Sequence, residues 1–245
     1  MATESKTASS LAETGERACW SCGAPRTVQF CASCGRVQPP QSVDYFTFFG
    51  LPRKLNIDVP SLQREFYELS RKLHPDLYGQ TSKQEQEWSL EQSSLLNDAY
   101  RTLKDPIKRT EYLLRLEGVQ LEEQSKSATE RARVSGEIKK QVVPPDLLEE
   151  VFELNMQLEE LRGNRETGED DPALIGELES HKTEFEKKYE SLGQELKQYW
   201  DQWDGVVDAD QEEKRRQVRD KMVDVLNRRN YIRNLVRDVN EALGS

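Results

Sequence analysis

The chain has 245 residues, of which 35% are hydrophobic and 33% are charged, and its formal net charge is −10. This length allows one large domain or two to three small ones, and the high charged fraction favours amphipathic helices over a buried parallel sheet. The negative charge argues against a nucleic-acid partner, which requires a basic face, and no apolar run approaches the length of a membrane span.

Residues 1–16 are rich in Ser, Thr, Ala and Glu and contain no Arg. A secretory signal would need an apolar core, and a mitochondrial presequence would be rich in Arg and poor in acidic residues. We therefore expect a disordered tail on a soluble protein of the cytoplasm.

All four cysteines lie within sixteen residues, as two Cys-x-x-Cys pairs that are each followed by Gly: Cys19, Cys22, Cys31 and Cys34. A thiolate pair with this spacing can bind one metal ion, and the Gly lets the backbone turn and aim its N–H groups at sulfur. Two such pairs predict a closed site for one structural zinc ion, with rubredoxin-like iron as the alternative. Two disulfides are disfavoured without an export signal, and a single redox pair would not explain the doubling.

The segment around these cysteines, 17–41, is too short to bury a core of its own. A bound metal should therefore supply most of its folding free energy, on the order of 10 kcal/mol. A short strand is possible at Thr27–Phe30, and Pro39 and Pro40 predict a stiff linker after the element.

A helix is predicted over 58–73. Its apolar residues recur at steps of four, three and four, as in a helix that faces a core: Leu62, Phe66, Leu69 and Leu73. Pro75 should end this helix, because it lacks an N–H group and keeps His74 out of the helical region. An exposed polar loop that begins with His74, Pro75 and Asp76 should then lead into a second, antiparallel helix over 83–104.

Two further helices should flank this hairpin. The one before it, over 44–50, has little more than one turn, with Tyr45, Phe46 and Phe49 turned inward. The one after it, over 106–116, begins with a Pro, which the first turn of a helix tolerates.

Four stretches in and around the hairpin form one pattern: Asp44-Tyr45-Phe46, Leu73-His74-Pro75-Asp76, Asn97-Asp98-Ala99-Tyr100-Arg101-Thr102-Leu103-Lys104-Asp105-Pro106-Ile107-Lys108-Arg109 and Glu111-Tyr112-Leu113-Leu114. Together they resemble a J domain and, more narrowly, the J domain of the HscB family, the co-chaperones of iron–sulfur cluster assembly. Some HscB-like proteins, including animal ones, carry a similar four-cysteine element. Without this context the His-Pro-Asp tripeptide would be an ordinary turn.

The resemblance implies a DnaK/HscA-type ATPase chaperone as a partner. Its binding residues would be the loop tripeptide and the basic outward face of the preceding helix: His74, Pro75, Asp76, Arg64, Arg71 and Lys72. The spacing of the basic residues alone would equally fit a solvated helix surface. Glu65 and Glu68 interrupt this face, so it should steer the chaperone rather than hold it tightly.

Residues 119–143 are polar and predict a linker. In the last region, 144–245, helices are expected at about 145–162, 171–203 and 209–242. Their short connections indicate antiparallel neighbours in a three-helix bundle or coiled coil.

The first of these three helices carries two neighbouring apolar stripes. By their spacing, Leu147, Val151, Leu154, Leu158 and Leu161 face the bundle, whereas Leu148, Phe152 and Met156 form a second stripe at steps of four. The second stripe is either part of a broad buried face or a docking surface. In HscB-like proteins the C-terminal domain binds the scaffold protein (IscU-like) on which clusters are built, and matching the motifs places Leu148, Phe152 and Tyr231 at contact positions.

The expected fold is all-α, with a J-domain helical hairpin and a C-terminal three-helix bundle, preceded by a small zinc knuckle. The expected segments are a tail at 1–16, the zinc element at 17–41, the J domain at 42–118, the linker at 119–143 and the scaffold-binding bundle at 144–245.

No phosphate-binding loop or nucleophile–base pair can be found in the sequence, so we expect no enzyme activity. The resemblance implies a co-chaperone that binds a cluster scaffold and stimulates the ATPase of its chaperone partner. The alternatives are a general J-domain co-chaperone for unfolded clients and a zinc-dependent adaptor without ATPase stimulation. Mitochondria are the alternative compartment, because eukaryotic HscB-like proteins often work there.

Overall fold

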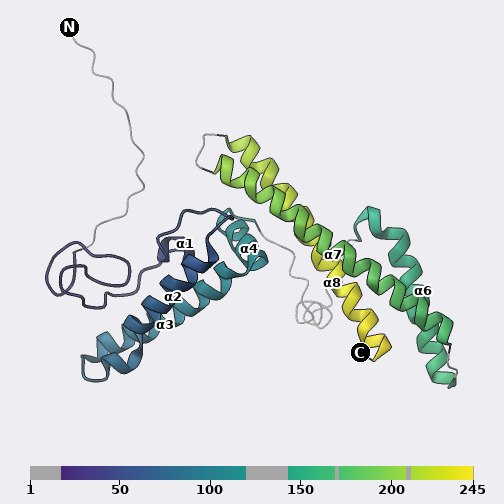
Figure 1. The fold of residues 1–245 in the computed structure, drawn as a ribbon, viewed down its shortest axis with the longest axis horizontal. Coiled ribbons are helices and arrows are strands. Elements are labelled where there is room, and N and C mark those ends of the chain that lie inside the picture. Colours follow the sequence, from purple (N-terminus) through teal and green to yellow (C-terminus); the bar gives the residue numbers. More distant parts are fainter. Residues whose placement is uncertain (1–17, 120–142, 169–170, 208–210, 245) are drawn as a thin grey trace, which may run out of the picture. The chain divides into compact units, whose positions relative to one another are not determined.

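The computed structural model describes residues 18–119, 143–168, 171–207 and 211–244, so the expected tail and nearly all of the expected linker lie outside it. The described residues form two compact units, one from 18–52 and 58–105, and the other from 53–57 together with the described residues after 105. Both units are built from helices (Figure 1). In the described ranges the β-type contacts are isolated bridges, and Thr27–Phe30 forms a turn instead of a strand.

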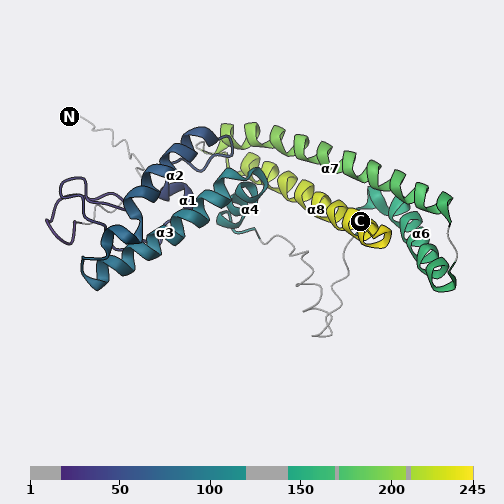
Figure 2. The same cartoon turned by 60° about the horizontal axis from the view of Figure 1, so that its bottom comes forward.

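The first unit contains the four-cysteine element and four helical elements: α1 (Tyr45–Phe48), α2 (Val59–Leu73), the 3₁₀ turn η1 (Pro75–Tyr78) and α3 (Lys83–Lys104). Side-chain caps fix where the longer helices begin, because Asp58 accepts the N–H of Ser61 and Ser82 accepts the N–H of Glu85. The antiparallel packing of α2 on α3, which Figure 2 shows side by side, confirms the predicted hairpin.

The core of this unit joins the hairpin to α1 and to the four-cysteine element. Its buried apolar residues are Val37, Phe48, Leu69, Leu73, Leu96 and Ala99. In α1 the fully covered residues are Phe46 and Phe48, whereas Tyr45 and Phe49 are only half-buried. Phe46 is thus buried as predicted, and Tyr45 and Phe49 pack partly buried against the core. The sequence analysis missed Phe48, because one helical turn is too short to define a stripe.

The second unit contains α4 (Pro106–Leu116), η2 (Pro145–Leu147), α6 (Leu148–Thr167), α7 (Pro172–Val206) and α8 (Glu212–Leu243). The long helices α7 and α8 lie side by side, and α6 packs against both of them (Figures 1 and 2). This is the predicted three-helix bundle, and the all-α fold is confirmed. No helix among the described residues combines the length and the low charge that a membrane span requires.

By its contacts, helix α4 groups with the bundle in the second unit. The J-domain segment 42–118 of the sequence analysis, which includes α4, stays a prediction. Two helices also continue past glycines at which the sequence analysis ended them. Gly163 lies inside α6, which ends at Gly168 in the left-handed conformation, and Gly205 lies inside α7. A single Gly costs a helix only about 1 kcal/mol, which the packing of such long helices readily offsets.

A short loop, Arg53–Ile57, is held by the end of α7. The carboxylate of Asp204 accepts the backbone N–H groups of Leu55 (2.7 Å) and Asn56 (2.9 Å), as well as the side-chain amide of Asn56. Trp203 donates its indole N–H to the carbonyl of Arg53 at 3.3 Å. Leu55 and Trp203 are fully buried, so this contact combines charge-assisted hydrogen bonds with an apolar centre.

We predict that Asp204→Ala lowers the free energy of unfolding by about 2–3 kcal/mol, because two backbone N–H groups lose a charged acceptor. The matched control is Asp201→Ala on the same helix, which removes only one hydrogen bond, to the exposed amide of Asn56. That variant should lose less than about 1 kcal/mol. Urea unfolding followed by tryptophan fluorescence measures both losses, and equal losses in the two variants would contradict the prediction.

Candidate functional site

The His-Pro-Asp tripeptide lies where α2 ends. His74 follows the last helical residue with φ −58° and ψ 125°, which breaks the helix, and Pro75 opens the 3₁₀ turn η1. The side chains of His74 and Asp76 are 57% and 87% exposed. The structure therefore presents the tripeptide at the surface, as the sequence predicted.

Hydrogen bonds inside the loop fix its shape. The imidazole Nδ1 of His74 accepts the backbone N–H of Asp76 at 3.3 Å, so the neutral ring carries its proton on Nε2. Tyr78 donates its hydroxyl to the carbonyl of Lys72 at 3.0 Å. The pKa of Tyr78 is raised, mainly by burial and to a smaller extent by the negative charge of Glu85. The phenol therefore remains a donor, and the loop is ordered before any partner arrives.

Side chains from the first turns of α3 form hydrogen bonds that hold the start of the loop. Ser89 and Ser93 donate their hydroxyls to the carbonyl of Leu73, at 2.7 and 2.8 Å, and so satisfy the last carbonyl before His74. Ser82 and Glu85 form a reciprocal capping box at the start of α3. Sequence reasoning missed these residues, although Ser-x-x-Glu at a predicted helix start is a signal that could have found the cap.

The outward face of α2 carries the predicted basic residues. Arg64, Arg71 and Lys72 are all exposed, and so are Glu65 and Glu68. Tyr67, which the sequence analysis did not single out, is also 54% exposed on this helix. The face thus has mixed charge with a basic end near the loop.

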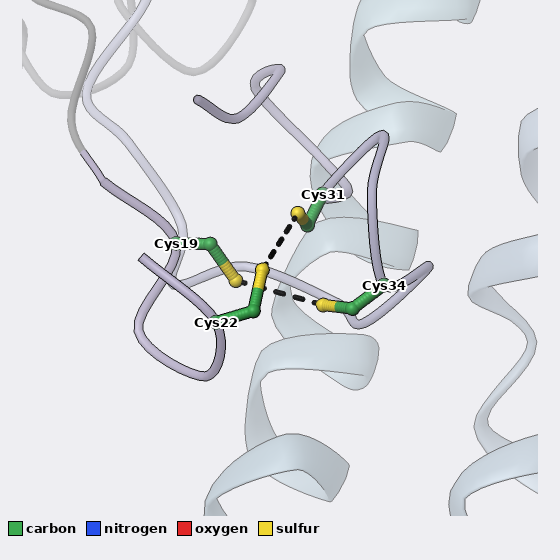
Figure 3. Close-up of side chains that lie close together, drawn as sticks. All are labelled: Cys19, Cys22, Cys31 and Cys34. Carbon is green, nitrogen blue, oxygen red and sulfur yellow. Dashed lines mark hydrogen bonds between the residues drawn. The ribbon is translucent and has the colours of Figure 1, made fainter. Parts of the chain in front are cut away.

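The four cysteines gather into one cluster with their sulfur atoms turned toward one another (Figure 3). The Sγ atoms of Cys19 and Cys34 are 3.7 Å apart, those of Cys22 and Cys31 are 3.6 Å apart, and all four lie within 4.8 Å of one another. A tetrahedral zinc–thiolate site has sulfur atoms about 3.8 Å apart, because each Zn–S bond is about 2.3 Å long. The cluster therefore fits one four-coordinate metal ion.

The surroundings of the cluster stabilise thiolate at Cys19 and Cys31. At Cys22 a backbone hydrogen bond from Ala24 lowers the pKa, but hydrogen bonds with the neighbouring cysteines and burial outweigh it and raise the pKa to about 12. Burial raises the pKa of Cys19, but hydrogen bonds from the backbone of Cys22 and Ser21 and from the amide of Gln38 outweigh it and lower the pKa to about 6. Backbone N–H groups likewise lower the pKa of Cys31. Thiolate is the form that coordinates metal, so these donors favour metal binding.

On α6 the two apolar stripes behave differently. The predicted bundle-facing residues Leu147, Val151, Leu154, Leu158 and Leu161 are all buried at 5% exposure or less. The second stripe is open, with Leu148, Phe152 and Met156 exposed by 58%, 68% and 59%. The broad buried face, which the spacing alone had left as an alternative, is therefore not what the structure has.

Tyr231 does not share this open surface. Its side chain is only 6% exposed and packs in the bundle core with Ile232 and Leu235, and burial followed by the charge of Asp238 raises its pKa. This placement corrects the expectation of a surface position for Tyr231. The motif match located the residue on the right helix, but packing turned it inward.

A family model described as DnaJ domain matches residues 44–112. The iron–sulfur cluster co-chaperone protein HscB homolog of Arabidopsis thaliana is 36% identical over 143 residues, which are 58% of this chain and 51% of that protein. The iron–sulfur cluster co-chaperone protein HscB of Mus musculus is 40% identical over 111 residues, or 43% of this chain and 47% of that protein. The chain thus spans about half the length of the curated relatives that it matches.

The crystal structure of human co-chaperone protein HscB has the same fold. It superimposes with a TM-score of 0.61 at 24% identity, and the match covers 91% of this chain and 97% of the human one. Residues 44–112 thus match a DnaJ domain, and the chain is similar to co-chaperones named HscB.

Proposed function

We propose that the chain is a co-chaperone in the assembly or transfer of iron–sulfur clusters. It catalyses no reaction itself and stimulates the ATPase of a DnaK/HscA-type chaperone. The observation that carries the proposal is the exposed His-Pro-Asp loop, which internal hydrogen bonds and α3 hold in one shape. The names of the similar proteins support the same role.

In this proposal Asp76 pairs with an arginine of the chaperone. A carboxylate and a guanidinium form a short, directional, charge-assisted bond, and the 87% exposure of Asp76 leaves its oxygens accessible. His74 contributes shape and a hydrogen bond from Nε2, while its Nδ1 keeps the backbone of Asp76 in place. The hydrolytic groups belong to the chaperone, so the histidine has no role as a base.

The basic residues Arg64, Arg71 and Lys72 steer the encounter with an acidic surface of the chaperone. Exposed charges of this kind raise association rates more than affinity, and added salt weakens their effect. The interspersed Glu65 and Glu68 limit the attraction, which suits a partner that must leave after each ATPase cycle.

The open stripe of Leu148, Phe152 and Met156 is proposed to bind a cluster scaffold protein (IscU-like). Exposed apolar side chains in a row along one helix are costly in water unless a partner covers them. Both apolar residues of the family-matched contact, Leu148 and Phe152, lie on this stripe, whereas the buried Tyr231 is left out of it.

We assign zinc to the four-cysteine cluster. A tetrahedral all-sulfur site with no open position suits a structural zinc ion, held by Cys19, Cys22, Cys31 and Cys34. Bound zinc would cross-link the two Cys-x-x-Cys turns and so supply folding energy to a segment without its own core.

Two other functions remain alternatives to this proposal. A general J-domain co-chaperone should bind many unfolded chains, whereas the proposed protein should bind one folded scaffold at about 1:1. A zinc-dependent adaptor should fail to stimulate any ATPase. The compartment proposed for this function is the cytoplasm.

For the loop, we predict that His74→Gln or Asp76→Asn abolishes stimulation of the chaperone ATPase and leaves the helix content unchanged. Both side chains are exposed, so neither substitution disturbs a core. Single-turnover ATP hydrolysis by the cognate chaperone and circular dichroism measure the two effects. Stimulation that survives both substitutions would refute the role of the loop.

For the stripe, Leu148→Ala and Phe152→Ala should leave the melting temperature nearly unchanged and weaken scaffold binding by about 1–2 kcal/mol each. Leu154→Ala and Leu158→Ala on the same helix are the matched controls, and these buried deletions should cost about 2–5 kcal/mol of stability. Thermal melts and a titration with the scaffold separate the two classes. Large stability losses at Leu148 and Phe152 with intact affinity would identify a core face.

For the metal, purified protein should contain about one zinc ion per chain. Cys22→Ser should release that zinc and unfold the four-cysteine element, because three thiolates no longer close the site. Elemental analysis identifies the metal, and amide exchange reports the unfolding. Iron as the native metal, or four free thiols without metal, would contradict the assignment of zinc.

A further inference from the structure

The four-cysteine element is built onto α3 rather than attached by the Pro39–Pro40 linker alone. Val37 is fully buried and shares one core with Leu69, Leu73 and Leu96 of the helical hairpin. Gln29, also from the element, donates its amide to the carbonyl of Phe48 at 2.6 Å. The element therefore uses the J-domain helices as its missing core.

One buried chain of hydrogen bonds leads from a metal ligand to α3. The side-chain amide of Gln38 donates to Sγ of Cys19 at 3.3 Å, and the backbone carbonyl of Gln38 accepts the amide of Gln92 at 2.7 Å. Gln38 and Gln92 are 0% and 1% exposed. A buried carbonyl and a buried amide that lose each other leave unsatisfied polar groups, so this contact is sensitive to the position of residue 38.

Two further contacts join the element to the first turns of α3. Trp20, which lies between the first two cysteines, packs edge-on against Trp88 with ring centroids 5.6 Å apart. Arg36 follows the second cysteine pair and lies 3.5 Å from the carboxylate of Glu85, which is also the capping residue of α3. The element thus contacts residues 85, 88 and 92, which lie on one face of the helix at steps of three and four.

The adjacent face of the same turns holds the His-Pro-Asp loop. Gln86 donates its amide to the carbonyl of Thr81 at 3.0 Å, and Ser89 and Ser93 hold the carbonyl of Leu73. Residues 86, 89 and 93 repeat the spacing of 85, 88 and 92 one position later. If these turns of α3 shift or become less ordered, the contact with the four-cysteine element and the contact with the His-Pro-Asp loop therefore both change.

We propose that metal binding by the four cysteines orders the first half of α3 and thereby positions the His-Pro-Asp loop, with Gln38 and Gln92 as the positioning residues of this coupling. A chain that loses its metal would keep its bundle and its hairpin but present a looser loop. The co-chaperone would then respond to the metal or thiol-redox state of its surroundings. This inference rests on the metal site of the proposed function.

The test is hydrogen exchange of the full chain, with metal bound and after removal of the metal by a chelator, with metal content measured in each sample. Removal should speed exchange at amides in 83–93 at least about fivefold, and leave the amides of α7 and α8 unchanged. Faster exchange confined to the four-cysteine element would overturn the coupling while leaving the metal assignment intact. Protein purified without any metal would overturn both.

Variants test the path of the coupling. Gln92→Leu keeps the volume of the side chain but removes its hydrogen bond, so the metal-bound variant should already exchange faster at 83–93 and respond to metal removal about twofold or less. Gln84→Leu, at an exposed position of the same helix, is the control and should respond as the unmodified chain does. Arg36→Met provides a second variant that leaves the cap of α3 in place. A full response to metal removal in both Gln92→Leu and Arg36→Met would overturn the assigned path.

Discussion

The packing of α2 against α3 is the interaction on which the rest of the first unit depends. Leu69 and Leu73 from α2 meet Leu96 and Ala99 from α3, and these buried residues set the distance between the two helices. The His-Pro-Asp loop spans the gap at one end of this pair, and its shape follows from where the two helices stop. The four-cysteine element adds Val37 to the same core, so a single apolar cluster supports both features.

This chain has about as many charged as hydrophobic residues, so apolar side chains are scarce. Short segments therefore pack against the apolar core of a larger neighbour instead of forming a core of their own. In the first unit the short cysteine element packs Val37 into the core of the helical hairpin. In the second unit Leu55 of the loop Arg53–Ile57 and Trp203 are both fully buried, and Asp204 accepts the backbone N–H groups of Leu55 and Asn56. Both segments are too small to fold alone, and each contains a fully buried apolar residue. The loop is also held by the carboxylate of Asp204, and the cysteine element contains a cluster that could hold a metal ion.

Local physical rules explain how much of this could be predicted. Pro75 ends α2, Asp58 caps it, and the leucine spacing of α6 identifies its buried side, because each signal acts within one or two turns of a helix. The contact of Asp204 with Leu55 joins residues that are 149 positions apart, and it leaves no periodic trace in the sequence. Tyr231 was misplaced for the same reason, since neighbouring helices decide which side of α8 is covered.

The four-cysteine cluster was predicted from sequence, but its contacts with the rest of the fold were not. The spacing predicted that Cys19, Cys22, Cys31 and Cys34 meet, because two Cys-x-x-Cys turns close together in sequence can bind one metal ion. The amide of Gln38 that reaches Cys19 carries no such signature, as a single Gln after a cysteine pair is unremarkable in sequence. A cluster of cysteines that could hold a metal is thus predictable from sequence, whereas the groups that connect it to the rest of the fold emerge only from packing.

The two proposed partner surfaces differ in charge, and this difference separates their partners. The α2 face ends in Arg71 and Lys72 beside the loop, whereas the open stripe of α6 is flanked by Glu149 and Glu153. A partner with an acidic surface is attracted to the first and repelled by the rim of the second, and an apolar partner with basic neighbours has the opposite preference. Under the proposed function, charge disfavours the wrong pairing, and the apolar side chains of Leu148 and Phe152 supply the affinity at the stripe. If the chain has the two proposed partners, this separation of charge directs each of them to its own surface without requiring tight binding at either one.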